Sequence, residues 1–202
     1  MIFSLIPNIE KLDIVLASMS PRRYEILKSL GLDFKVVASG IEEEMTNSGD
    51  PVWFTHKYAR EKGEAVAALH PDELVISADT VVALENHIMG KPRSEQDAFY
   101  ILSKLSGRTH QVYTAFGLFL KRYEKEFVNH MVTDVTFRDL TDEEIWAYIN
   151  TGEAGDKAGA YGIQGQGSLL VKGIQGCFFN VVGFPIARFY IDLEAFLKDL
   201  AL

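Results

Sequence analysis

The chain has 202 residues, of which 48% are hydrophobic and 24% are charged, a composition typical of folded globular proteins and not of disordered ones. Its formal net charge of −8 argues against duplex DNA or RNA as the main partner, because an acidic surface repels a phosphate backbone. The single cysteine excludes an internal disulfide framework, and we see neither an apolar run of the roughly 18 residues needed to span a bilayer nor a secretory signal, so we expect one cytoplasmic domain, 1–202.

Apolar runs and helix-start signals alternate along the first half of the chain. Ser20 followed by Pro21 is typical of a helix start, and Asp50 followed by Pro51 repeats the pattern. A polar turn at 85–86 ends the longest apolar run. We predict strands over 12–17, 34–38 and 74–84, and helices over 20–30 and 51–70.

The second half opens with a helix that begins at Ser94 and ends at Gly107. Two strands follow, antiparallel across a charged turn, and Thr141 with Glu144 forms a capping box before a short helix. A glycine-rich segment precedes a last helix that starts near Pro185. The strands are predicted at 111–120 and 127–137, the turn at 121–126 and the glycine-rich segment at 152–167. This order predicts an α/β fold, a twisted mixed sheet with helices on both faces.

Two arginines, Arg22 and Arg23, fall in the first turn of the helix that begins at Ser20. The positive end of the helix dipole disfavours cations there. A bound anion reverses that argument, because helix N–H groups, serine hydroxyls and two guanidinium groups make a phosphate site. The alternative is two solvated arginines that happen to start a helix, and this segment alone leaves both interpretations open.

Asp79 lies in the middle of an apolar strand, where an unpaired carboxylate is costly to bury. A metal, a lysine or a basic substrate group would compensate it, and we favour this functional interpretation over a hydrated strand end. Lys62 lies on the apolar face of its helix, although a lysine there more often extends its amine to solvent. Lys91 lies between Gly90 and Pro92, and this position alone is weak evidence for a functional role.

Two further segments have candidate ligand groups. The acidic run 42–44 is typical of a solvated turn, or supplies one oxygen ligand to Mg²⁺ or Mn²⁺. Gln164, within glycine-rich 159–167, can contact a base edge through both amide groups, although the segment matches no Walker or dinucleotide fingerprint. The chain has no GxSxG and no HExxH motif, so metal-assisted attack by water is the chemistry that the residues favour.

In order and spacing, these segments resemble the Maf family of nucleoside triphosphate pyrophosphatases over nearly the whole chain. The resemblance implies an elongated α/β fold with a mixed sheet and a central cleft, related to the inosine triphosphate pyrophosphatases, and a homodimer. The matching motifs are Leu-Ala-Ser-Met-Ser-Pro-Arg-Arg at 16–23, Ser-Ala-Asp-Thr-Val-Val at 77–82, Gly-Lys-Pro at 90–92, Leu-Ser-Gly-Arg-Thr-His at 105–110 and Asp-Lys-Ala-Gly-Ala-Tyr-Gly-Ile-Gln-Gly at 156–165.

The resemblance also implies roles for individual residues. Asp79 matches the proton acceptor that activates water and also touches the metal, Mg²⁺ or Mn²⁺, and Glu42 matches the other acidic position at the metal. The Gly-Ile-Gln-Gly segment resembles the subgroup that acts on dTTP and UTP. The positions around the triphosphate are Ser18, Arg22, Arg23, Lys62 and Lys91, and those linked to substrate choice are Arg22, Thr80 and Gln164.

These observations lead to one main hypothesis, hydrolysis of a nucleoside triphosphate to the monophosphate and pyrophosphate, with dTTP and UTP preferred. Its role would be the removal of pyrimidine or modified nucleotides. One alternative keeps the chemistry but acts on modified purine nucleotides such as 7-methyl-GTP. The other is a nucleotide-sensing regulatory protein that affects septum formation.

Overall fold

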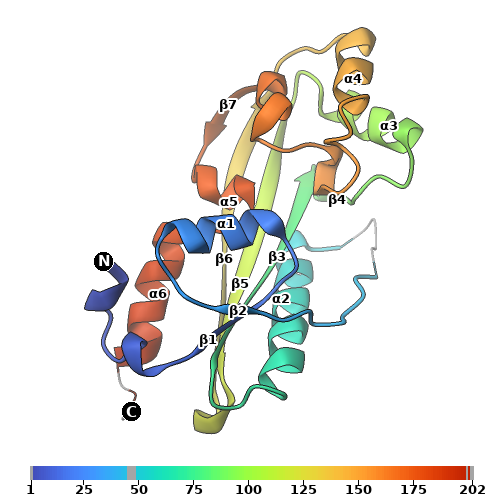
Figure 1. The fold of residues 1–202 in the computed structure, drawn as a ribbon. Helices are drawn as coiled ribbons and strands as arrows, with labels where there is room; N and C mark the ends of the chain where they lie inside the picture. The colour runs from blue at the N-terminus through green and yellow to red at the C-terminus, as the bar shows by residue number, and fades with distance from the viewer. Residues whose placement is uncertain (1, 45–48, 199, 201–202) are drawn as a thin grey trace.

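The computed structural model describes residues 2–44, 49–198 and 200, and its centre is a seven-stranded twisted sheet that runs along an elongated molecule (Figure 1). The strand order is β2-β1-β3-β5-β6-β7, and β4 pairs with β3. β1 is parallel to β2 and β3, and the other pairs are antiparallel, so the predicted mixed α/β sheet is confirmed. The strands are β1 (Ile14–Ala17), β2 (Lys35–Val36), β3 (Leu74–Leu84), β4 (His87–Met89), β5 (Thr109–Leu120), β6 (Lys125–Phe137) and β7 (Val171–Gln175).

The helices begin close to where the capping signals predict. Asp50 accepts a hydrogen bond from the Val52 N–H, and Thr141 with Glu144 forms the full capping box, whereas Ser20 precedes its helix without a side-chain cap bond. In the described ranges, no helix is both long and apolar enough to pass through a bilayer. The α-helices are α1 (Pro21–Ser29), α2 (Pro51–Ala67), α3 (Glu95–Leu105), α4 (Asp142–Ile149), α5 (Phe178–Val182) and α6 (Ile186–Lys198).

Helices cover both faces of the sheet, as predicted (Figure 1). α1 and α6 pack on one face against a core that includes Leu16, Ile76 and Phe116. α2 packs on the other face, where Val75 and Phe119 belong to the core. α3 and α4 close one end of the molecule. Since side chains alternate along a strand, neighbouring residues of β3 contribute to opposite faces.

One interruption in the sheet positions the site. β1 pairs with β3 only as far as Ser77, and β4 pairs with β3 only from Val82 onward. Among the described residues, positions 78–81 of β3 therefore have no strand partner on that side. Asp79 and Thr80 lie in this gap on opposite faces of the strand, and both reach the cavity that opens there.

Candidate active site

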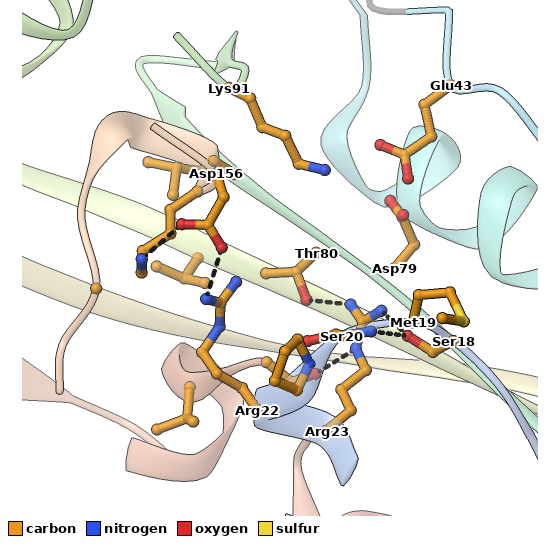
Figure 2. Close-up of a pocket in the computed structure, with 18 of the residues that line it drawn as sticks. Ser18, Met19, Ser20, Arg22, Arg23, Glu43, Asp79, Thr80, Lys91 and Asp156 are labelled. Carbon is orange, nitrogen blue, oxygen red and sulfur yellow. Dashed lines mark hydrogen bonds and ion pairs between the residues drawn. The ribbon is translucent and has the colours of Figure 1, made fainter. Parts of the chain in front are cut away.

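A cavity of about 690 Å³ lies beside the gap in β3, between the start of α1, the segment 38–43 and the loop 153–165 (Figure 2). Lysine and arginine side chains gather in it, although the chain as a whole is acidic. Such a concentration of cations suits a polyanionic ligand. The charged residues that line it are Arg22, Arg23, Lys62, Lys91, Lys157, Glu43, Asp79, Glu153 and Asp156.

Arg23 is buried and held by three hydrogen bonds. Its Nε donates to the Gly183 carbonyl, its Nη1 to Ser18 Oγ and its Nη2 to Thr80 Oγ1, each at 3.0 Å. Burial lowers the pKa of the guanidinium, and the carboxylates of the site oppose this shift. A guanidinium has five N–H groups, so within the described part of the chain two remain for a ligand. The prediction places Ser18, Arg23 and Thr80 in one site, and the structure brings them together.

Lys62 joins two carboxylates on the α2 side of the strand. Its Nζ lies 2.6 Å from Asp79 Oδ1 and 2.5 Å from Glu43 Oε1. Burial raises the pKa of Asp79, and Lys62 only partly offsets that shift. Burial also acts to raise the pKa of Glu43, but Lys62, with smaller contributions from Lys91 and Asp79, outweighs it and this pKa is lowered. A carboxyl with a raised pKa is a better proton acceptor than an ordinary one.

Glu43, and not Glu42, lies beside Lys62 and Asp79 in the structure. Glu42 is exposed and is not among the residues that line the cavity, whereas Glu43 is half-buried beside Lys62. Burial alternates along this stretch, with Ile41 and Glu43 partly buried at the cavity and Glu42 and Glu44 exposed. The prediction of Glu42 as the second acidic group therefore differs from the structure by one position.

The carboxylate pair fits a hard divalent cation. Asp79 Oδ2 is buried and, among the described residues, has no hydrogen-bond partner. No set of three or more possible metal ligands occurs in the described ranges. Mg²⁺ commonly takes only one or two protein carboxylates and completes its shell with water and substrate phosphates. Glu43 and Asp79 are thus a suitable donor set for a cation that arrives with a triphosphate.

Arg22 and Lys157 extend the cationic lining toward the loop 153–165. Arg22 Nη1 lies 3.2 Å from Asp156 Oδ2, and Lys157 Nζ lies 2.6 Å from Asp156 Oδ1. Burial acts to raise the pKa of Asp156, but the hydrogen bonds and charges of Lys157 and Arg22 together outweigh it and the pKa is lowered. Lys91 is exposed and extends into the cavity from the opposite wall (Figure 2). Arg22 and Lys91 thus both line the cavity that contains Asp79.

The loop that carries Gln164 is fixed by its neighbours. Gln164 itself is exposed and lines the cavity. The Glu153 carboxylate accepts hydrogen bonds from the N–H groups of Gln166 and Gly167. A Cβ at Gly167 would lie 2.1 Å from the Gly162 carbonyl oxygen, so only glycine fits there without moving the backbone. The Gln164 amide is therefore presented from a defined main chain.

His110 supports the same loop from beneath. It is fully buried, its Nε2 lies 2.8 Å from the Tyr161 hydroxyl, and its Nδ1 has no partner among the described residues. Burial lowers the pKa of His110 to about 4. A second proton would place a charge and an unpaired donor in the core.

We therefore expect acid to destabilise the protein through His110. The unfolded chain binds a proton near pH 6.5 and the folded chain near pH 4, so stability is lost as the pH falls through this window. Between pH 7 and pH 4.5 the loss should be about 2–3 kcal/mol. Urea unfolding at both pH values checks this, with His110→Gln as the non-titrating control. Equal pH dependence in the two proteins would contradict it.

Sequence reasoning missed four charged residues of the site: Glu43, Glu153, Asp156 and Lys157. Burial alternates from Ile41 to Glu44, so a period-of-two pattern from Ile41 could have found the first. The other three lie in a glycine-rich loop without periodicity, so their inward position depends on contacts that the sequence does not show.

The chain is similar to known proteins over most of its length. A family model described as Maf-like protein matches residues 13–196. A dTTP/UTP pyrophosphatase of Carboxydothermus hydrogenoformans is 49% identical over 183 residues, which cover 90% of this chain and 97% of that protein. A dTTP/UTP pyrophosphatase of Aquifex aeolicus is 47% identical over 177 residues, 88% of this chain and 92% of that protein. Among solved structures, a nucleoside-triphosphatase (dITP/XTP pyrophosphatase) of Mycobacterium abscessus has a TM-score of 0.49 and 14% identity, over 95% of this chain and all of that one.

Proposed function

The chain belongs to the Maf family, and on this premise we propose that it hydrolyses nucleoside triphosphates, with dTTP and UTP preferred, to the monophosphate and pyrophosphate. The observation that carries the proposal is one cavity that holds both a buried carboxylate, Asp79, and a cluster of cations. The cations neutralise a triphosphate, and the carboxylate supplies a base beside it.

In this reaction the oxygen of a water attacks the α-phosphorus, and the bond from that phosphorus to the bridging oxygen breaks. Asp79 accepts the proton of the water, and its Oδ2 is the oxygen available for it, because Oδ1 is occupied by Lys62. Lys62 holds that carboxylate in place between β3 and α2. Arg22, Arg23 and Lys91 bind the phosphates and stabilise the charge that develops on the departing pyrophosphate.

Glu43 and Asp79 would hold the divalent cation, Mg²⁺ or Mn²⁺, together with phosphate oxygens. When bound, that cation polarises the phosphoryl group and neutralises charge at the scissile bond. The motive is the buried Asp79 Oδ2, which has no partner among the described residues and lies beside the Glu43 carboxylate. This oxygen has two lone pairs, one for the proton of the water and one for the cation.

Selection of the base falls to the loop that carries Gln164. The amide of Gln164 has a donor and an acceptor, which match the O4 and N3–H groups shared by thymine and uracil. Cytosine presents the opposite pattern. Glu153 accepts hydrogen bonds from the backbone N–H groups at 166 and 167, which hold the main chain of the loop in place. Discrimination also requires that neighbouring backbone groups fix the orientation of the Gln164 amide.

Gln164→Glu is expected to reduce the preference for UTP over CTP, because the variant loses the amide donor. The dependence of the rate on metal concentration should stay the same. Initial rates with UTP, dTTP and CTP measure the ratio. Gln164 would lose its assigned role if the variant kept the ratio of the unsubstituted protein.

The activity itself is tested with nucleotides labelled at the β-phosphate. We expect the label in pyrophosphate, with dTTP and UTP cleaved faster than CTP, the purine triphosphates or 7-methyl-GTP. Label that first emerges in orthophosphate would overturn the proposal. Binding of nucleotides without any cleavage would favour a regulatory, nucleotide-sensing protein.

The proposal includes a cytoplasmic homodimer that removes pyrimidine or modified nucleotides. The cytoplasm is proposed because nucleoside triphosphates, the substrates, are made and used there. The dimer follows from the family resemblance, and sedimentation of the purified chain measures it.

A further inference from the structure

A chain of buried hydroxyl groups runs from the cavity into the protein. Arg23 Nη2 donates to Thr80 Oγ1 at 3.0 Å, and the hydroxyls of Thr80 and Thr114 lie 3.0 Å apart. Thr114 Oγ1 then donates to the main-chain carbonyl of Asn180, also at 3.0 Å. Thr114 and Asn180 are fully buried, and neither is among the residues that line the cavity.

The direction of these hydrogen bonds follows from the groups involved. A carbonyl only accepts, so Thr114 uses its one hydroxyl hydrogen on Asn180. Thr80 must then donate to Thr114, and the Thr80 oxygen presents a lone pair to Arg23. If the Thr80 hydrogen pointed at the guanidinium instead, two donors would face each other. Thr114 therefore sets the polarity that Arg23 requires.

Asn180 is itself fixed on the sheet. Its Nδ2 donates to the Val112 carbonyl and to Thr133 Oγ1, both at 2.9 Å. Since the Val112 carbonyl only accepts, the amide has one orientation. The Thr133 hydroxyl also donates to the Cys177 carbonyl at 3.2 Å and accepts from its N–H at 3.1 Å. The main chain of α5 is thereby tied to β5 and β6.

Asn180 also affects the position of Arg23 through the main chain of α5. α5 leads directly into Gly183, whose carbonyl accepts from Arg23 Nε. Two of the three acceptors that hold the guanidinium, Thr80 and Gly183, thus depend on the placement of Asn180. They fix the plane of the guanidinium and leave its remaining N–H groups for phosphate oxygens. A guanidinium in a fixed plane suits bidentate contact with a phosphate.

We propose that Thr114 and Asn180 are positioning residues, which orient Arg23 for the phosphates through the Thr80 hydroxyl. This inference rests on the proposed function, since Arg23 contacts phosphate only if a nucleotide occupies the cavity. It also gives Thr80 a role toward Arg23 in addition to its predicted part in substrate choice.

Thr114→Val tests the proposal, because valine keeps the shape and removes the hydroxyl. We expect the KM for dTTP and the Kd for inorganic pyrophosphate to rise about tenfold, equivalent to about 1.4 kcal/mol, with a smaller loss in kcat. Thr114→Ser should restore most of the affinity. Thr55→Val is the matched control, because it removes an equally buried hydroxyl, which donates to the Pro51 carbonyl within α2 and takes no part in this network.

A double-mutant cycle adds a readout that a merely structural residue would not change. Thr80→Val should raise KM and Kd by a similar factor, and the Thr80→Val, Thr114→Val double variant should be no worse than either single one. Additive losses would overturn the proposal, as would unchanged constants in folded Thr114→Val or an equal loss in Thr55→Val. If Thr114→Val does not fold, Thr80→Val, at the partly exposed end of the chain of hydroxyls, carries the same expectation.

The two readouts separate this inference from the proposed function. A wild-type protein that binds pyrophosphate but cleaves no nucleotide would refute the activity, while the Kd values still decide the role of Thr114. A wild-type protein that cleaves dTTP with variants unaffected would refute the positioning role alone. Failure of the wild-type protein to bind pyrophosphate would also overturn the positioning role.

Discussion

Asp79→Asn is expected to lower kcat for dTTP by about 10²–10⁴, the usual cost of losing a general base. Asparagine keeps the shape of the side chain but accepts a proton poorly. The fold should survive, because Lys62 keeps its contact with Glu43 and no unpaired ammonium is left behind. Steady-state kinetics give kcat, and thermal unfolding shows whether the variant is folded.

A folded Asp79→Asn protein with near-normal turnover would show that another group takes the proton. Within the described residues of the cavity, Glu43 is the remaining carboxylate in contact with Lys62. The Asp79→Asn, Glu43→Gln double variant then distinguishes a shared base from a base outside this pair.

Glu43→Gln is expected to lower kcat/KM by about a hundredfold at limiting Mg²⁺, and Glu42→Gln by no more than about twofold. Each variant loses one negative charge, and the two positions are neighbours, so both change the long-range electrostatic potential at the site by a similar amount. They differ in geometry, because only Glu43 contacts Lys62 and lines the cavity. Loss of a group that holds or orients a metal typically costs about 10–100-fold or more.

Titration of the rate with Mg²⁺ gives the decisive measurement for this pair. Excess metal should recover part of the Glu43→Gln activity and leave Glu42→Gln unchanged. A large loss in Glu42→Gln with little loss in Glu43→Gln would reverse the assignment and restore the expectation from family resemblance.

Much of the fold could be predicted where a local signal was strong. β3 has the predicted bounds, because its apolar run is bordered by a turn in which Glu85 and Asn86 both have positive φ. The capping residues place the starts of α2, α3 and α4. β4, β7 and α5 were not predicted, because each is too short to show a period in its hydrophobic residues. β7 is also largely exposed, so it lacks the apolar run that indicates a buried strand.

Individual residues of the candidate site could be predicted, but the contacts between them could not. A strand carboxylate at Asp79 and two arginines at the start of α1 were recognisable because each is locally unfavourable without a partner. That Lys62 is the partner of Asp79 depends on how α2 packs on the sheet. No spacing rule links residues 17 positions apart on a helix and a strand.

The long pairing of β5 with β6 has a consequence for how the enzyme admits its substrate. The ladder runs from Thr109↔Thr136 to Leu120↔Lys125, and β5 contributes Val112 to one core and Leu118 to another. A hinge between these cores would have to bend this continuous ladder, whereas the segments 38–43 and 153–165 border the cavity outside it. We therefore expect entry and exit of the nucleotide to depend first on these two segments.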